Sequence, residues 1–200
     1  MTQERSLEDK WIPEIGRQRL ARIIQNKCLS PFDDGYFVNL DPIWSDPESL
    51  GLAERVVSDF LVKLKAEWAY DAIVVPIRIS RTFGVLPIVG AASARSSVPI
   101  VVWEAFACPI SGEAFTFPID FVPKSPILFD GVLAKGKGIT CTMIDLIKGK
   151  SFDMQGIACI VDMKLGGSQY VKDKTAPTLG RQIKFSSLLD IDDVVVKKND

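Results

Sequence analysis

Four continuous apolar segments most constrain what this chain can fold into. They are DAIVVPI at 71–77, VPIVVWEAF at 98–106, SPILFDGVL at 125–133 and GIACIVDM at 156–163. Strands that are apolar throughout, rather than at every second residue, are buried on both faces of a sheet. Helical patterns separate several of these segments, and such alternation is typical of a parallel sheet covered by helices. The sequence therefore predicts an α/β fold with helices on both faces of the sheet.

The helical patterns between and before the strands have recognisable ends. The clearest begins at Asp46, which can cap the first turn, and continues with Pro47, which suits the first helical position. A short strand is expected at 36–40, and Pro87 is expected to bend the helix that contains it. The segment 107–124 lacks helical spacing and predicts a flap or β-hairpin. The remaining predicted helices span about residues 13–26, 81–96 and 139–148.

Composition excludes several classes of function. The 24 basic and 25 acidic residues nearly cancel, which argues against binding to nucleic acid or to an anionic membrane. No apolar segment approaches the ~20 residues of a membrane-spanning helix, and the polar start carries no secretory signal, so we expect a cytoplasmic protein. The chain has no histidine. Any chemistry must therefore use carboxylates, lysine, arginine, backbone amides or a bound divalent ion.

The segment after the third apolar strand carries the strongest chemical signal. Ligands of open parallel sheets bind at the carboxyl ends of the strands, and here the strand contains Asp130 and runs into a glycine-containing loop. Glycines let a ligand approach the backbone, amides at a helix start favour an anion, and the lysines add positive charge. The loop matches neither a P-loop nor a GxGxxG fingerprint, so a structural glycine turn with solvated lysines remains the alternative. The predicted phosphate-binding residues are Ala134, Lys135, Gly136, Lys137 and Gly138.

The order of strand, acidic residue, short glycine loop and helix resembles the signature of type I phosphoribosyltransferases, most closely orotate phosphoribosyltransferase. The likeness extends over nearly the whole chain, through GYFVNLDPIWSDPESLGLAERVVSDFL, DAIVVPIRISRTFGVLPIVGAASA, VPIVVWEAFACPISGEAF, GIACIVDMKLGG and FSSLLDIDDVV. This resemblance implies a single domain over residues 1–200, with an N-terminal hood at 1–45, a core at 46–200 and a flap. It also implies a homodimer.

The resemblance assigns roles to individual residues. It implies that Asp130 holds the ribose hydroxyls of phosphoribosyl pyrophosphate, while the loop amides bind the 5′-phosphate. Arg78 and Arg81 lie where the family binds pyrophosphate, and solvated or salt-bridged arginines are the alternative. The alternative for Asp130 is a helix cap. Trp103 and Phe106 could stack on a base, with core packing as their alternative.

The chain departs from the family at several of these positions. The second acidic residue of the family is Gly131 here, its Arg-Lys pair falls at Trp103 and Glu104, and its orotate-contacting arginine corresponds to Met163. The flap sequence SGEAF has neither lysine nor histidine. We therefore expect a protein that binds a nucleoside monophosphate or phosphoribosyl pyrophosphate and is catalytically degenerate or regulatory. The alternative is an active transferase for a base other than orotate, with Mg²⁺ bound through its substrate.

Overall fold

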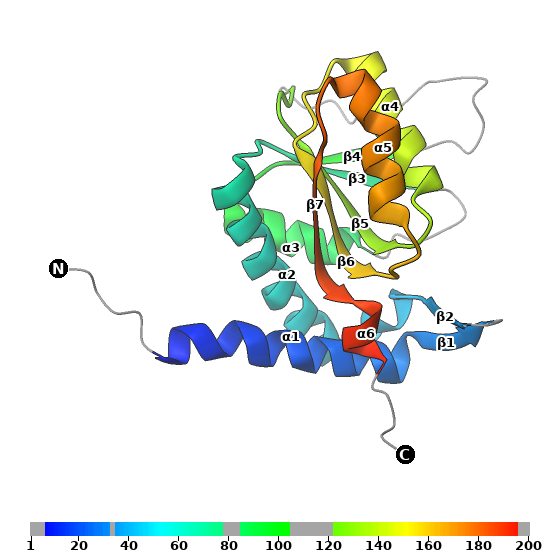
Figure 1. The fold of residues 1–200 in the computed structure, drawn as a ribbon. Helices are drawn as coiled ribbons and strands as arrows, with labels where there is room; N and C mark the ends of the chain where they lie inside the picture. The colour runs from blue at the N-terminus through cyan, green and yellow to red at the C-terminus, as the bar shows by residue number, and fades with distance from the viewer. Residues whose placement is uncertain (1–6, 33–34, 78–84, 105–121, 196–200) are drawn as a thin grey trace.

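The protein is described by a computed structural model that covers residues 7–32, 35–77, 85–104 and 122–195 (Figure 1). Within these residues, no helix is both long enough and apolar enough to cross a lipid bilayer. The elements in chain order are α1 (Leu7–Lys27), β1 (Leu29–Phe32), β2 (Gly35–Val38), the 3-10 turn η1 (Asp41–Ile43), α2 (Pro47–Trp68), β3 (Ile73–Ile77), α3 (Leu86–Ser96), β4 (Ile100–Glu104), β5 (Ile127–Leu133), α4 (Lys137–Lys150), β6 (Gly156–Asp162), α5 (Gly167–Leu179), β7 (Lys184–Asp190) and α6 (Ile191–Val194).

The five core strands form one sheet in the order β4-β3-β5-β6-β7, with every neighbouring pair parallel. The chain winds outward from β3 to β4, then returns to the other side of β3 and continues through β5 and β6 to β7. The winding direction therefore reverses between β3 and β5. These two strands pair at Ile73–Ile127 and Val74–Leu128, near their amino ends, so they part toward their carboxyl ends. Ligands of open α/β sheets bind at such a switch point.

Helices cover both faces of the sheet (Figure 1). On one face, α2 and α3 pack over a buried cluster that includes Ile73, Val75 and Phe129. On the other face, α4 and α5 pack over a second cluster that includes Val74 and Leu128. Successive residues of one strand thus enter opposite clusters. This arrangement explains why the strands are apolar throughout.

The N-terminal region lies across one end of the sheet. Leu20 and Ile24 of α1 are fully buried, and α1 packs against α2. β1 and β2 form an antiparallel hairpin with register from Leu29–Val38 to Phe32–Gly35. Figure 1 shows α1, this hairpin and the short C-terminal helix α6 at the end of the sheet where β5 and β6 terminate. This position corresponds to the predicted hood.

Most of the predicted core elements are confirmed, and so is the α/β architecture. Asp46 caps α2, because its side chain accepts a hydrogen bond from the N–H of Glu48, and Pro47 occupies the first turn. The predicted bend at Pro87 is wrong. Pro87 lies in the first turn of α3, where a missing N–H costs nothing, so the helix simply starts there.

Other elements differ from the sequence predictions. The strand expected at 36–40 ends at Val38, and its partner β1 was not predicted. The helix α5 and the strand β7 were not predicted from periodicity. Of the predicted flap at 107–124, residues 107–121 lie outside the part of the chain that the structure describes.

Candidate functional site

Three neighbouring strands carry acidic side chains around Cys159: Asp130 lies in the middle of β5, and Asp162 and Asp190 lie at the carboxyl ends of β6 and β7. Asp130 on β5 pairs in register with Cys159 on β6, and Asp162 at the end of β6 pairs with Asp190 at the end of β7. Burial raises the pKa of the Cys159 thiol well above its ordinary value, and the neighbouring carboxylates of Asp162 and Asp130 raise it further. The carboxylates therefore lie close to the buried Cys159, which stays a protonated, unreactive thiol.

Asp130 is half-buried beside the point where β3 and β5 part. Its Oδ1 accepts a hydrogen bond of 2.7 Å from the N–H of the next residue, Gly131. The helix-cap alternative for Asp130 does not hold, because the N-cap of α4 is Gly136. Asp130 is thus a carboxylate at the switch point of the sheet, where ligands of this architecture bind.

Gly131 faces the buried cluster under α2 and α3. A β-carbon at this position would lie 3.1 Å from Cδ1 of Leu40 and 3.6 Å from Cγ2 of Val85. Both neighbours belong to the buried cluster under α2 and α3. The side chain of an acidic residue at position 131 would leave the backbone into apolar surroundings, where an unpaired charge is costly. The packing around position 131 therefore suits glycine better than an acidic residue.

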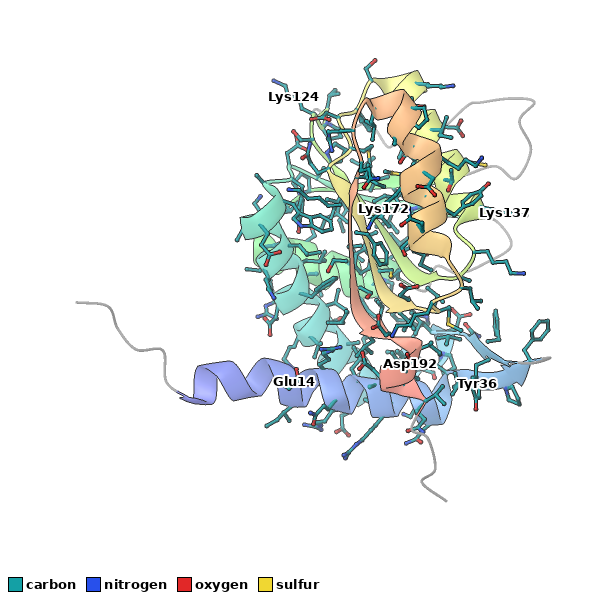
Figure 2. All side chains as sticks on the ribbon, in the orientation of Figure 1. Glu14, Tyr36, Lys124, Lys137, Lys172 and Asp192 are labelled. Carbon is teal, nitrogen blue, oxygen red and sulfur yellow. The ribbon has the colours of Figure 1, made fainter. Side chains whose placement is uncertain are left out.

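The predicted phosphate loop connects β5 to α4. Gly136 has φ +72°, a left-handed conformation that glycine adopts without strain, and it is the N-cap of α4. Its carbonyl oxygen accepts bonds from the N–H and the hydroxyl of Thr140, at 3.0 and 2.7 Å. Gly136 offers no side chain to cap the first amides of α4, and amides at a helix start favour an anion. Lys135 and Lys137 are exposed, and Figure 2 shows Lys137 at the outer side of the helix start.

A second loop, from β6 to α5, lies directly against the phosphate loop. A β-carbon on Gly167 would stand 2.2 Å from the carbonyl oxygen of Ala134 and 3.1 Å from the backbone nitrogen of Gly136. Real β-carbons do not approach backbone atoms this closely, so position 167 requires glycine. The helix α5 begins here with another left-handed glycine, Gly166, as its N-cap. The sequence showed a glycine pair at 166–167, but nothing in it indicated which loop the pair would touch.

The remaining predicted site residues fall in different places. Arg78, Arg81 and Phe106 lie outside the described residues. Trp103 is buried, with 6% of its surface exposed, and packs in the cluster under α4 and α5. This is the core packing that the sequence left open as its alternative, and its role beside a base stays a prediction.

The described residues form no metal cage of their own. Within them, no group of three or more Cys, Asp or Glu side chains is arranged to hold a metal ion. Asp130, Asp162 and Asp190 therefore do not form a metal-binding group by themselves.

Comparison with known proteins decides the fold. No protein-family model matches the chain, and none of the curated proteins is significantly similar in sequence. A phosphoribosyltransferase from Corynebacterium diphtheriae superposes with a TM-score of 0.66 at 16% identity, covering 90% of this chain and 98% of that one. Orotate phosphoribosyltransferase of Mycobacterium tuberculosis H37Rv, in complex with 5-phospho-α-D-ribosyl 1-diphosphate (PRPP), gives 0.63 at 15%, with 97% and 100% covered. Adenine phosphoribosyltransferase from Leishmania donovani gives 0.59 at 19%, with 90% and 85% covered.

The chain has the type I phosphoribosyltransferase fold. The resemblance of segment order seen in the sequence is thereby confirmed at the level of architecture. Identities below 20% carry the fold and leave the activity to the residues of the site.

Proposed function

We propose that this protein binds a phosphorylated ribose, either a nucleoside monophosphate or PRPP, and acts as a binding or regulatory protein rather than as an efficient transferase. The observation that carries the proposal is the loop after β5. It ends at the N-terminus of α4, whose N-cap Gly136 has no capping side chain, and Asp130 stands four residues before Ala134, the first residue of the loop, at the switch point of the sheet. An anion and a neighbouring diol can be bound by these two groups together.

The proposed roles follow from the donors and acceptors present. The amides of residues 134–138 would bind the 5′-phosphate, with the exposed Lys135 and Lys137 adding charge. Asp130 would accept hydrogen bonds from the ribose hydroxyls. Arg78 and Arg81 would contact a pyrophosphate group, and Trp103 and Phe106 would lie on the base side. These last four assignments rest on the sequence alone.

The proposal of weak or absent catalysis rests on the side of β5 that lost its carboxylate. Leu40 and Val85 pack against the face of β5 that a side chain at position 131 would occupy. Because residue 131 is glycine, Asp130 has no acidic neighbour next to it on its own strand. A single carboxylate can accept hydrogen bonds from a diol. It stabilises the positive charge that develops on a ribosyl centre less than two carboxylates would. Glu104, which stands where the family has a basic pair, would repel a departing pyrophosphate.

The alternative function is an active phosphoribosyl transferase for a base other than orotate. The observation that favours it is the PRPP complex of a structure with the same fold. In that case Mg²⁺ would enter with the pyrophosphate of the substrate. A cytoplasmic location and a homodimer are further predictions, and size-exclusion chromatography with light scattering tests the dimer.

Thermal unfolding with a ligand panel tests the proposal. PRPP, UMP and AMP are each added with and without Mg²⁺, at about a hundred-fold excess over the dissociation constant. Binding to the native state alone should raise the melting temperature by about 5–10 °C. Pyrophosphate release with a panel of bases then separates the two functions. No shift with any of these ligands would overturn the proposal, and steady pyrophosphate release would favour the transferase.

A further inference from the structure

The loop from β6 to α5 connects the phosphate loop to the C-terminal helix. At one end, Gly167 contacts the backbone of Ala134 and Gly136, as described above. A β-carbon on Gly136 would likewise lie 2.6 Å from the carbonyl oxygen of Gly167, so the two loops share a backbone contact from both sides. A displacement of residue 167 toward the phosphate loop must therefore move that loop, and a displacement away from it removes its support.

At its other end, this loop is held by Lys164. The backbone N–H of Lys164 donates a 2.9 Å hydrogen bond to the buried carboxylate of Asp162. Its Nζ lies 3.1 Å from Oδ2 of Asp190 and 2.8 Å from Oδ2 of Asp192. Lys164 also has φ +54°, a conformation that costs a non-glycine residue free energy and persists only where neighbours hold it. The three carboxylates supply that restraint.

Two of these carboxylates belong to the start of α6, which is itself fastened to α1. Asp190 is the N-cap of α6 and its N–H donates to Asp193, while Arg17 of α1 forms a 2.7 Å ion pair with Asp193. Figure 2 shows Asp192 on α6, at the end of the molecule where α1 also lies. A continuous set of contacts thus joins α1, α6, residues 163–167 and the phosphate loop.

We propose that residues 163–167 couple occupancy of the phosphate loop to docking of the C-terminal helix α6, with Lys164 as the positioning residue. The ligand part rests on the proposed function, whereas the mechanical coupling does not need a ligand. Lys164 acts through Gly167 and contacts no reacting atom. Coupling of this kind is reciprocal, so a ligand on the loop should also tighten α6.

The ion pairs of Lys164 are solvent-exposed, so their loss should not unfold the protein. Their effect should be local, in the loop they restrain. The substitution Lys164→Ala keeps a β-carbon and hence a similar backbone preference at φ +54°, so it removes the ammonium and the three methylenes that carry it. Arg95→Ala is the matched control. It removes another exposed ion pair, with Asp59 at 3.2 Å, between α3 and α2.

Hydrogen exchange measured by mass spectrometry without ligand tests the coupling. Lys164→Ala should speed exchange about two- to ten-fold in residues 134–140 and 191–195, with an unchanged melting temperature. Lys164→Arg should restore slow exchange, and Arg95→Ala should leave both segments unchanged. Faster exchange in 191–195 alone, with residues 134–140 unchanged, would overturn the coupling, because Lys164 would then hold only the C-terminus.

Titration with AMP separates this inference from the proposed function. If the wild-type protein binds AMP, Lys164→Ala should weaken binding about two- to ten-fold. Equal affinity in the two proteins would overturn the coupling. Absence of AMP, UMP and PRPP binding to the wild-type protein would count against the proposed function, and the exchange of residues 134–140 would still decide the coupling.

Discussion

The Cδ1 atom of Leu40 lies 3.1 Å from the place that a β-carbon on Gly131 would occupy. Leu40 follows the β1–β2 hairpin, and Gly131 lies in the middle of β5, so this contact joins the N-terminal region to the strand that carries Asp130. The sequence resemblance to orotate phosphoribosyltransferases places the second acidic residue of that family at position 131. The change to glycine is therefore built into the packing of the N-terminal region.

Restoring the missing acid should not restore a working acidic pair. Gly131→Asp places a carboxylate against Leu40 and Val85 and should lower the free energy of unfolding by about 1–3 kcal/mol. Gly131→Ala adds a β-carbon without a charge, so it measures the cost of the added volume alone. Because Cδ1 of Leu40 is the end of a flexible side chain, it should yield at little cost. Chemical denaturation of both variants checks this, and a stable Gly131→Asp protein that releases pyrophosphate would contradict it.

The sequence predicted the architecture well because its apolar strands are unambiguous. Strands buried on both faces leave continuous apolar runs, and these located β3, β4, β5 and β6 to within a few residues. The glycine loop before α4 was also predicted, since its φ +72° residue is a glycine. Local rules decide such features, so local sequence reveals them.

The features that the sequence did not reveal depend on contacts between distant residues. β7 reads KFSSLLD, which is half-polar, so it lacks the apolar signature of the other strands. α5 contains Pro177 and a polar outer face, which weakens its periodicity. The contact of Gly167 with Ala134 joins residues 33 positions apart by their numbering, and periodicity carries no trace of it.

The contact between the two glycine loops should be intolerant of a single methyl group. Gly167→Ala brings a β-carbon to within 2.2 Å of the Ala134 carbonyl oxygen, so the loops must separate. We expect a loss of about 1–3 kcal/mol in the free energy of unfolding and loss of phosphate-ester binding. Gly149→Ala, in α4 with no atom within 4 Å of the new β-carbon, is the control and should be neutral. Unchanged binding in Gly167→Ala would argue against the close contact.

Trp103 offers a test of core packing against base stacking. Trp103 is 6% exposed in the cluster under α4 and α5, so Trp103→Ala should cost about 3–5 kcal/mol of stability. Trp103→Phe keeps an aromatic ring and should cost less. If Trp103→Phe retains its stability but loses affinity for AMP relative to ribose 5-phosphate, the base-side role is supported. Calorimetry with the two ligands distinguishes these outcomes.

Docking of α6 should depend on pH through Asp193. Burial opposes ionisation of Asp193, but the N–H of Asp190 and the Arg17 guanidinium hold its pKa below the ordinary 3.8. A lowered folded-state pKa gives a contribution that is complete above pH ~4 and is lost as the pH falls through the folded value. The protection factor of residues 191–195, which corrects the exchange rate for its intrinsic pH dependence, should therefore fall in acid. Asp193→Asn should show fast exchange already at neutral pH, and identical profiles for both proteins would contradict this.

Calorimetric titration of wild-type protein and Asp130→Asn with PRPP and with inorganic phosphate tests the central claim most directly. Phosphate should go to the loop amides and bind both proteins equally. PRPP also needs the carboxylate for its ribose hydroxyls, so Asp130→Asn should bind it at least about ten-fold more weakly. Equal PRPP affinity in the two proteins, or no PRPP binding to the wild type, would contradict the assignment of this edge as a phosphoribosyl site.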